Sequence, residues 1–66
     1  GISEIRKIIK KSSELIKNGG KLVLEIAYNQ KEEVKFLLKK NNFYINSVVK
    51  DLAKNERCII STKTKK

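Results

Sequence analysis

Seven residues that follow a pair of glycines constrain the fold of this chain more than any other feature. Residues 21–27 read KLVLEIA, an apolar run interrupted by one acid, Glu25. A run this short after Gly19-Gly20 lacks the length of a typical helix, and its apolar side chains fall on both alternating faces. We therefore predict a strand covered on both sides, as in the parallel sheet of an α/β protein.

Helical periodicity precedes this strand. Between residues 3 and 17, isoleucine and leucine recur at spacings of three and four, with lysines off that stripe. Ser3 has a side chain suited to the helix N-cap. Asn18 and the two glycines that follow it are expected to end the helix, because glycine adopts the left-handed conformation without a Cβ clash.

A second helix is predicted over residues 30–41, where the apolar side chains line one face. Asn29 and Glu32 have the spacing of a capping box at its start. Asn42 follows its last residue and is expected to adopt the left-handed conformation that glycine usually takes at this place.

The remaining residues alternate with a period of two. A strand is predicted from about 44 to 51, with Ile45, Ser47 and Val49 on one face and Tyr44, Asn46 and Val48 on the other. Residues 53–56 are polar enough for a turn, and Arg57 to Lys63 is predicted to return as an antiparallel strand. The order is αβαββ, which places the fold in the α/β class, with residues 64–66 as a frayed tail.

A net charge of +9 would ordinarily suggest a nucleic-acid partner. The lysines are scattered over five segments, however: Lys10, Lys17, Lys31, Lys39, Lys50 and Lys63. We interpret the charge mainly as solvated surface and expect only weak, non-specific contact with nucleic acid.

The length of 66 residues allows one domain with a small core. The chain contains no methionine and begins at Gly1, so we expect residues 1–66 to be a single partial domain excised from a longer protein. No segment approaches the roughly 20 apolar residues of a membrane helix, and no signal peptide is visible. We expect no membrane association and a cytoplasmic location.

Few side chains in this sequence are suited to catalysis or to metal binding. Histidine is absent, which excludes Ser-His and Cys-His pairs, and no Cys/His cluster exists for a metal. Cys58 lies among isoleucines in a predicted strand and is interpreted as an inert thiol. Gly19-Gly20 precedes a strand, whereas a phosphate-binding loop runs from a strand into a helix. We therefore predict no catalytic, cofactor-binding or metal-binding residues.

Two residues remain as candidate substrate contacts. Glu25 lies near the carboxyl end of a predicted parallel strand, where open α/β sheets bind their ligands. The alternative, which we favour, is that Glu25 pairs with a lysine or an amide at the sheet edge. Gln30, at the start of the second helix, is the other candidate.

The ordered set of these features resembles the C-terminal part of the HemK/PrmC family of release factor glutamine methyltransferases. The resemblance covers nearly the whole chain and rests on Gly19-Gly20, Leu24-Glu25, Gln30, Phe43, Asp51-Leu52 and Arg57. Two departures concern turns: Asn42 stands where glycine is usual, and Ala27-Tyr28 where glycine often follows the strand.

The resemblance implies the C-terminal third of a class I, Rossmann-like methyltransferase domain: a three-stranded mixed sheet with two helices, the last strand inserted antiparallel between the other two. The parent enzyme would transfer a methyl group from S-adenosylmethionine to a glutamine of a release factor. The chain contains neither that family's glycine-rich donor loop nor its Asn-Pro-Pro-Tyr motif, so by itself we expect it to bind no cofactor and to be inactive.

Two alternatives from other classes stay open, a small basic RNA-binding module and a self-associating interaction domain. Self-association would use the strand at 21–27, because its outer edge lacks the neighbouring strand that a parallel sheet would supply. Open apolar edges recruit other chains. We expect the simplest product to be a two-fold antiparallel homodimer.

Overall fold

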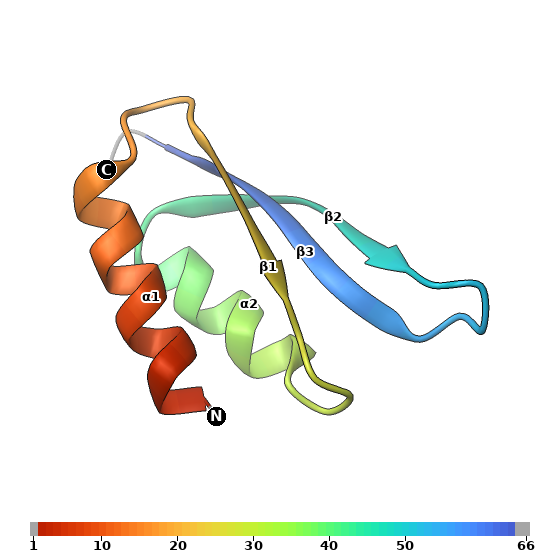
Figure 1. Cartoon of the computed structure of the whole chain (residues 1–66). Helices are drawn as coiled ribbons and strands as arrows, with labels where there is room; N and C mark the ends of the chain where they lie inside the picture. The colour runs from red at the N-terminus through yellow and green to blue at the C-terminus, as the bar shows by residue number, and fades with distance from the viewer. Residues whose placement is uncertain (1, 65–66) are drawn as a thin grey trace.

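The computed structural model describes residues 2–64 and has two helices on a three-stranded sheet (Figure 1). The elements are α1 (Ile2–Leu15), β1 (Lys21–Glu25), α2 (Lys31–Lys40), β2 (Phe43–Lys50) and β3 (Glu56–Lys63). The predicted order αβαββ is confirmed, and each boundary lies within about two residues of its prediction.

The strand order in the sheet is β1-β3-β2, so the last strand lies between the other two. This insertion agrees with the arrangement implied by the resemblance. The expected mixed sheet is wrong for the described strands, because β3 pairs antiparallel with both of its neighbours. Strands β1 and β2 run in the same direction, but β3 separates them.

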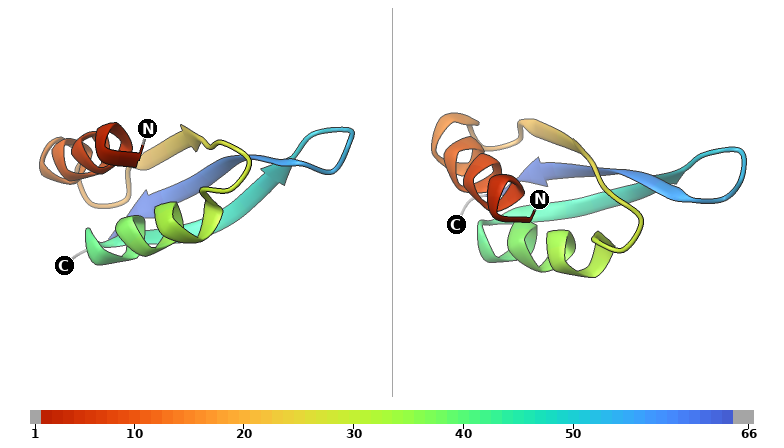
Figure 2. Two further views of the ribbon diagram at one scale, coloured as in Figure 1. Left: turned by 90° about the horizontal axis from the view of Figure 1, so that it is seen from below. Right: turned by 60° about the horizontal axis from the view of Figure 1, so that its bottom comes forward.

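Both helices lie against one face of the sheet (Figure 2), where their apolar stripes meet it. The core residues are Ile9 from α1, Val34, Leu37 and Leu38 from α2, and Leu24, Ile26, Phe43 and Ile59 from the sheet side. The opposite face is open among residues 2–64, so the prediction that β1 is covered on both sides is wrong. Leu24 is buried, whereas Val23 is 58% exposed.

A β-bulge at Asn46 shifts the register of β2. Ile45 pairs with Ser61 and Ser47 pairs with Ile60, which leaves Asn46 without an opposite residue. The predicted alternation therefore fails beyond this point: Ile45 and Val48 both pack against the core. The extra residue reverses the faces of all later side chains in the strand.

The glycines after α1 serve two different purposes. Gly19 has a φ of +91°, the left-handed conformation expected here. At Gly20 the constraint is space, because an added Cβ would lie 2.4 Å from Cγ2 of Ile16. The predicted N-cap at Ser3 is wrong, since Ser3 is already within the helix.

Helix α2 begins one residue later than the predicted capping box requires. Gln30, not Asn29, occupies the N-cap position, and no side chain caps the helix there. At the other end Asn42 has a φ of +69°, which confirms its left-handed conformation.

The predicted frayed tail at 64–66 lies outside the described residues except for Thr64. That residue is held, because both its N–H and its hydroxyl donate to the carbonyl oxygen of Asn42 at 2.8 Å. The end of β3 is thereby fastened to the start of β2.

Candidate functional site

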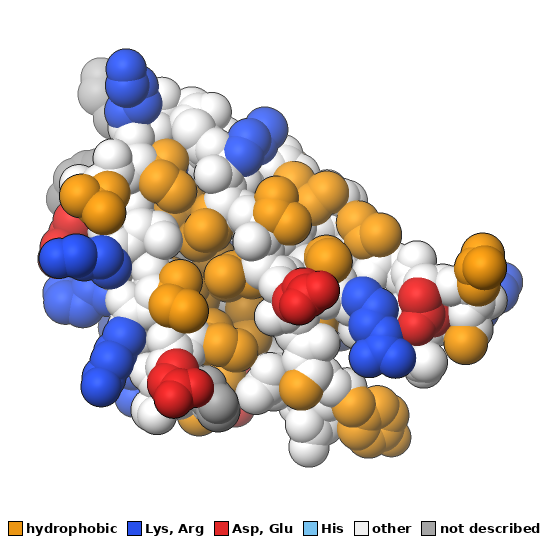
Figure 3. Space-filling model, viewed as in Figure 1, with side chains coloured by type: hydrophobic (Ala, Val, Ile, Leu, Met, Phe, Trp, Pro, Cys, Tyr) orange, Lys and Arg blue, Asp and Glu red, His pale blue; other side chains and the backbone are white. Residues whose placement is uncertain are grey.

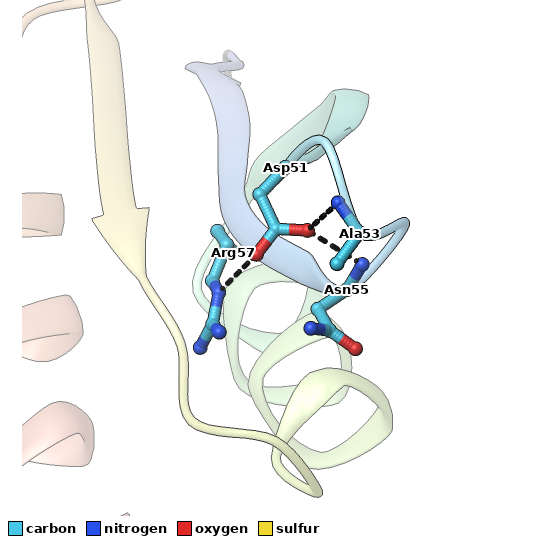
Figure 4. Close-up of polar contacts among 4 residues, drawn as sticks. All are labelled: Asp51, Ala53, Asn55 and Arg57. Carbon is cyan, nitrogen blue, oxygen red and sulfur yellow. Dashed lines mark hydrogen bonds and ion pairs between the residues drawn. The ribbon is translucent and has the colours of Figure 1, made fainter.

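The loop between β2 and β3 is organised by one carboxylate, that of Asp51 (Figure 4). Its Oδ1 accepts hydrogen bonds from the backbone N–H groups of Ala53 and Asn55, both at 2.9 Å. Its Oδ2 accepts from Nε of Arg57, also at 2.9 Å. Two backbone hydrogen bonds close the same loop, from the N–H of Asp51 to the carbonyl of Asn55 and from the N–H of Lys54 to the carbonyl of Asp51, both at 2.9 Å. Leu52 at the tip is fully exposed.

These contacts change the acidity of Asp51. The hydrogen bond from Arg57 is the largest cause, followed by the bond from the backbone of Asn55, and together they hold the pKa of Asp51 below its ordinary value. Each donor stabilises the ionised carboxylate and not the neutral acid. The loop geometry and the negative charge on Asp51 therefore support each other.

A second ion pair joins α2 to the same hairpin. Nζ of Lys31 lies 2.9 Å from Oε2 of Glu56, and both side chains are 30% exposed. The hydrogen bond between them raises the pKa of Lys31 and lowers the pKa of Glu56. The first residue of α2 is thus held against the first residue of β3.

A surface pocket of about 300 Å³ lies beside these pairs, lined by Tyr28, Lys54, Asn55, Glu56 and Arg57. Tyr28 comes from the loop after β1 and is 90% exposed. The charged groups of Glu56 and Arg57 are already engaged in ion pairs. The residues that line this pocket provide no activated nucleophile or base.

The two predicted site residues have different surroundings. Oε1 of Gln30 accepts the N–H of Ala27 at 3.0 Å, so its amide closes the loop that enters α2. Glu25 ends β1 with an exposed side chain, opposite Cys58 of β3. The favoured pairing of Glu25 with a lysine is not present among residues 2–64.

The remaining reactive side chains provide no further candidate site among residues 2–64. Cys58 is free and only partly buried, less enclosed than an inert core thiol would be. Within residues 2–64, no three histidine, cysteine or acidic side chains gather as metal ligands. Nor does the described part of the chain include a helix with the length and hydropathy needed to cross a bilayer.

The connection from β1 to α2 does not fit a nucleotide-like cofactor. Residues 26–30 join a strand to a helix, the order that a phosphate- or nucleoside-binding loop requires. They contain no glycine, and the Gln30 side chain bonds back into the loop. Close backbone approach to such a ligand is therefore not provided here.

Sequence reasoning missed the structural role of Asp51, which it used only as part of a family resemblance. A local signal was available, because an aspartate side chain often bonds the backbone N–H two residues later. The Arg57 contact and the Lys31–Glu56 pair depend on tertiary packing and carried no such signal.

Comparison with known proteins finds related sequences. The chain is 43% identical over 63 residues to the release factor glutamine methyltransferase of Fusobacterium nucleatum, covering 96% of this chain and 18% of that protein. It is 38% identical over 63 residues to the protein of the same name from Buchnera aphidicola, covering 96% and 23%. A bifunctional methyltransferase of Rickettsia felis is 37% identical over 60 residues, covering 91% and 11%.

The chain therefore spans about a fifth of the length of the first two relatives it matches. No family model matches it. No solved structure matches it either.

Acidification should open the Asp51 loop. The lowered pKa means that the contribution of Asp51 to the free energy of unfolding is complete above the ordinary aspartate pKa of about 4. That contribution is lost as the pH falls through the lowered value. Amide shifts of Ala53 and Asn55 in ¹⁵N–¹H spectra should report one acid transition. The Asp51→Asn variant should lack it and the Glu56→Gln variant should keep it. The same transition in the Asp51→Asn variant would contradict this assignment.

Proposed function

We propose that this chain, a HemK/PrmC-family sequence by its similarity to release factor glutamine methyltransferases, forms the C-terminal structural section of such an enzyme. The parent would be a class I, Rossmann-like methyltransferase in the cytoplasm that uses S-adenosylmethionine to methylate the side-chain nitrogen of a release factor glutamine. Identity of 43% and 38% over 63 residues carries this proposal.

The contacts within the chain support a structural role. Asp51 and Arg57, both part of the family resemblance, bond to each other and close the hairpin. Phe43, also part of it, is 2% exposed and belongs to the core. Gln30 bonds its own loop. These residues maintain the β1-β3-β2 sheet and its helices, and none of them has the surroundings of an acid–base catalyst.

The groups that would hold the methyl donor and the glutamine belong to other parts of the parent. The chain contains no proline, which excludes the Asn-Pro-Pro-Tyr motif. Its connection from β1 to α2 lacks glycine. The role we propose is to complete the sheet of the parent domain and to present the hairpin at its end.

A chimaeric enzyme would test this role. The matching 63 residues of the Fusobacterium nucleatum relative would be replaced by this chain, and glutamine methylation of a release factor followed by mass spectrometry. We expect activity within about tenfold of the unmodified enzyme, because core substitutions that conserve volume and pattern keep the fold. The relative lacking the segment, as negative control, should be inactive. A folded chimaera that binds donor but does not methylate would refute the proposal.

The chain alone should not bind S-adenosylmethionine. Among the described residues, 26–30 connect a strand, β1, to a helix, α2. This connection does not fit a nucleotide-like ligand. Isothermal calorimetry with micromolar donor should give no saturable heat, whereas the chimaera should. Saturable binding by the isolated chain would contradict this expectation.

For nucleic acid we propose weak, non-specific contact. A groove between α1 and α2 is lined by Arg6, Lys10 and Lys40 and by Phe36, which is 63% exposed. Contacts of this kind are mostly to phosphate, so affinity should fall by orders of magnitude between about 0.05 and 0.2 M salt. Fluorescence anisotropy with labelled single-stranded RNA measures this, and a complex that persists at the higher salt would argue for a dedicated RNA-binding module.

A further inference from the structure

The hairpin between β2 and β3 extends beyond the end of β1. Strand β1 stops at Glu25, which pairs with Cys58. The next residue, Ile26, donates its N–H to the carbonyl of Arg57 at 2.8 Å. Residues 51–56 lie past these contacts, and the loop they form projects from the body of the molecule (Figure 1).

Hydrogen bonds within the hairpin hold this projecting loop in one conformation. Asp51 accepts three hydrogen bonds from the loop, and two backbone bonds close it (Figure 4). All of them lie within residues 51–57, so the conformation of the loop does not depend on what lies beside β1. Leu52 at the tip therefore loses little conformational freedom when a partner covers it, because its backbone is fixed before binding.

Lys54 has a backbone conformation that lysine seldom adopts. Its φ is +69°, in the left-handed region where glycine or asparagine is less strained. Strained residues of this kind gather at ligand-binding sites. The side chain of Lys54 is exposed, and its ammonium group has no ion-pair partner among residues 2–64.

The acidic side chains near Lys54 are already paired. Asp51 bonds Arg57, and Glu56 bonds Lys31. Lys54 therefore gives its pocket a surplus positive charge. Only Nε of Arg57 is bonded to Asp51, and within residues 2–64 its terminal N–H groups have no hydrogen-bond partner. One surplus charge beside two carboxylates suits a single acidic side chain and disfavours a run of phosphates.

The pocket also lies at the end of the sheet where ligands bind in related architectures. Strands β1 and β2 run in the same direction, so both carboxyl ends lie at this end. Tyr28 follows β1, residues 54–57 follow β2, and together they line the pocket. Open α/β sheets bind their ligands outside the carboxyl ends of the strands.

We propose that this hairpin docks the protein substrate of the parent enzyme. Leu52 packs on an apolar side chain of that protein, and Lys54 and Arg57 bind one of its acidic residues. Tyr28 borders the same pocket, and tyrosine and arginine are enriched among the residues that dominate protein interfaces. In Figure 3 the projecting end of the molecule carries hydrophobic side chains beside basic ones. This inference rests on the proposed function, which makes a release factor the substrate.

Binding of the release factor by the chimaeric enzyme tests the docking. Labelled release factor from Fusobacterium nucleatum would be titrated with chimaera at about 0.05 M salt, and the dissociation constant measured by fluorescence anisotropy. Lys54→Glu and Leu52→Ser should each raise it about tenfold. Lys11→Glu, the same charge reversal at an exposed site on α1, should leave it within about twofold. Lys54→Glu should also weaken the dependence of binding on salt.

Methylation kinetics give a second measurement. In the active chimaera Lys54→Glu and Leu52→Ser should raise KM for the release factor and leave kcat unchanged, because docking is the same in the ground state and the transition state. A fall in kcat with KM unchanged would overturn the proposal, as would dissociation constants that neither variant changes. An equal effect of Lys11→Glu would also overturn it, since overall charge would then explain the result.

Thermal melting of the chimaera separates docking from packing within the parent domain. A fall in melting temperature of more than about 4 °C in Leu52→Ser would mean that the tip packs inside the parent, which would overturn the proposal. An inactive chimaera whose binding of the release factor still depends on Leu52 and Lys54 would refute the proposed function and support the docking role of the hairpin.

Discussion

The pairing of β3 with both of its neighbours is the interaction on which the rest of the structure depends. In the described structure β1 and β2 do not pair with each other, so neither is part of a sheet until β3 lies between them. Ile59, fully buried in β3, belongs to the same core cluster as the buried side chains of both helices. Removal of β3 would leave β1 and β2 without the strand to which each of them is hydrogen-bonded.

Local sequence signals predicted the elements because each is encoded by its own residues. Left-handed Gly19 and Asn42, the apolar stripes of the helices and the turn before β3 are all such signals. The face of the sheet that each helix covers is not encoded by local sequence. The run around Val23 reads as buried on both sides, yet the two helices follow connections that bring them to the same face. The bulge at Asn46 was also unpredictable, because alternation alone contains no sign of an unpaired residue.

The candidate site likewise contains features that local sequence predicts and features that depend on tertiary packing. Glu25 and Gln30 drew attention as polar residues beside an apolar strand, and the structure gives Gln30 a bond within its own loop and leaves Glu25 exposed. The pairs that organise this end of the molecule, Asp51–Arg57 and Lys31–Glu56, join residues through folding. A sequence reveals such pairs only when local geometry supplies one of the partners, as for Asp51 and the backbone of its loop.

The insertion of β3 also sets the order in which the molecule can fold. Lys21 is joined to Thr62, a residue 41 positions later in the chain, and the N–H of Gly19 bonds the carbonyl of Lys63. Contacts of such long sequence separation form late and slow the folding of a small domain. During synthesis, β1 emerges from the ribosome long before its partner exists. Until β3 follows, β1 lacks the strand that pairs with it in the described structure, so this part of the sheet is completed only at the end of synthesis.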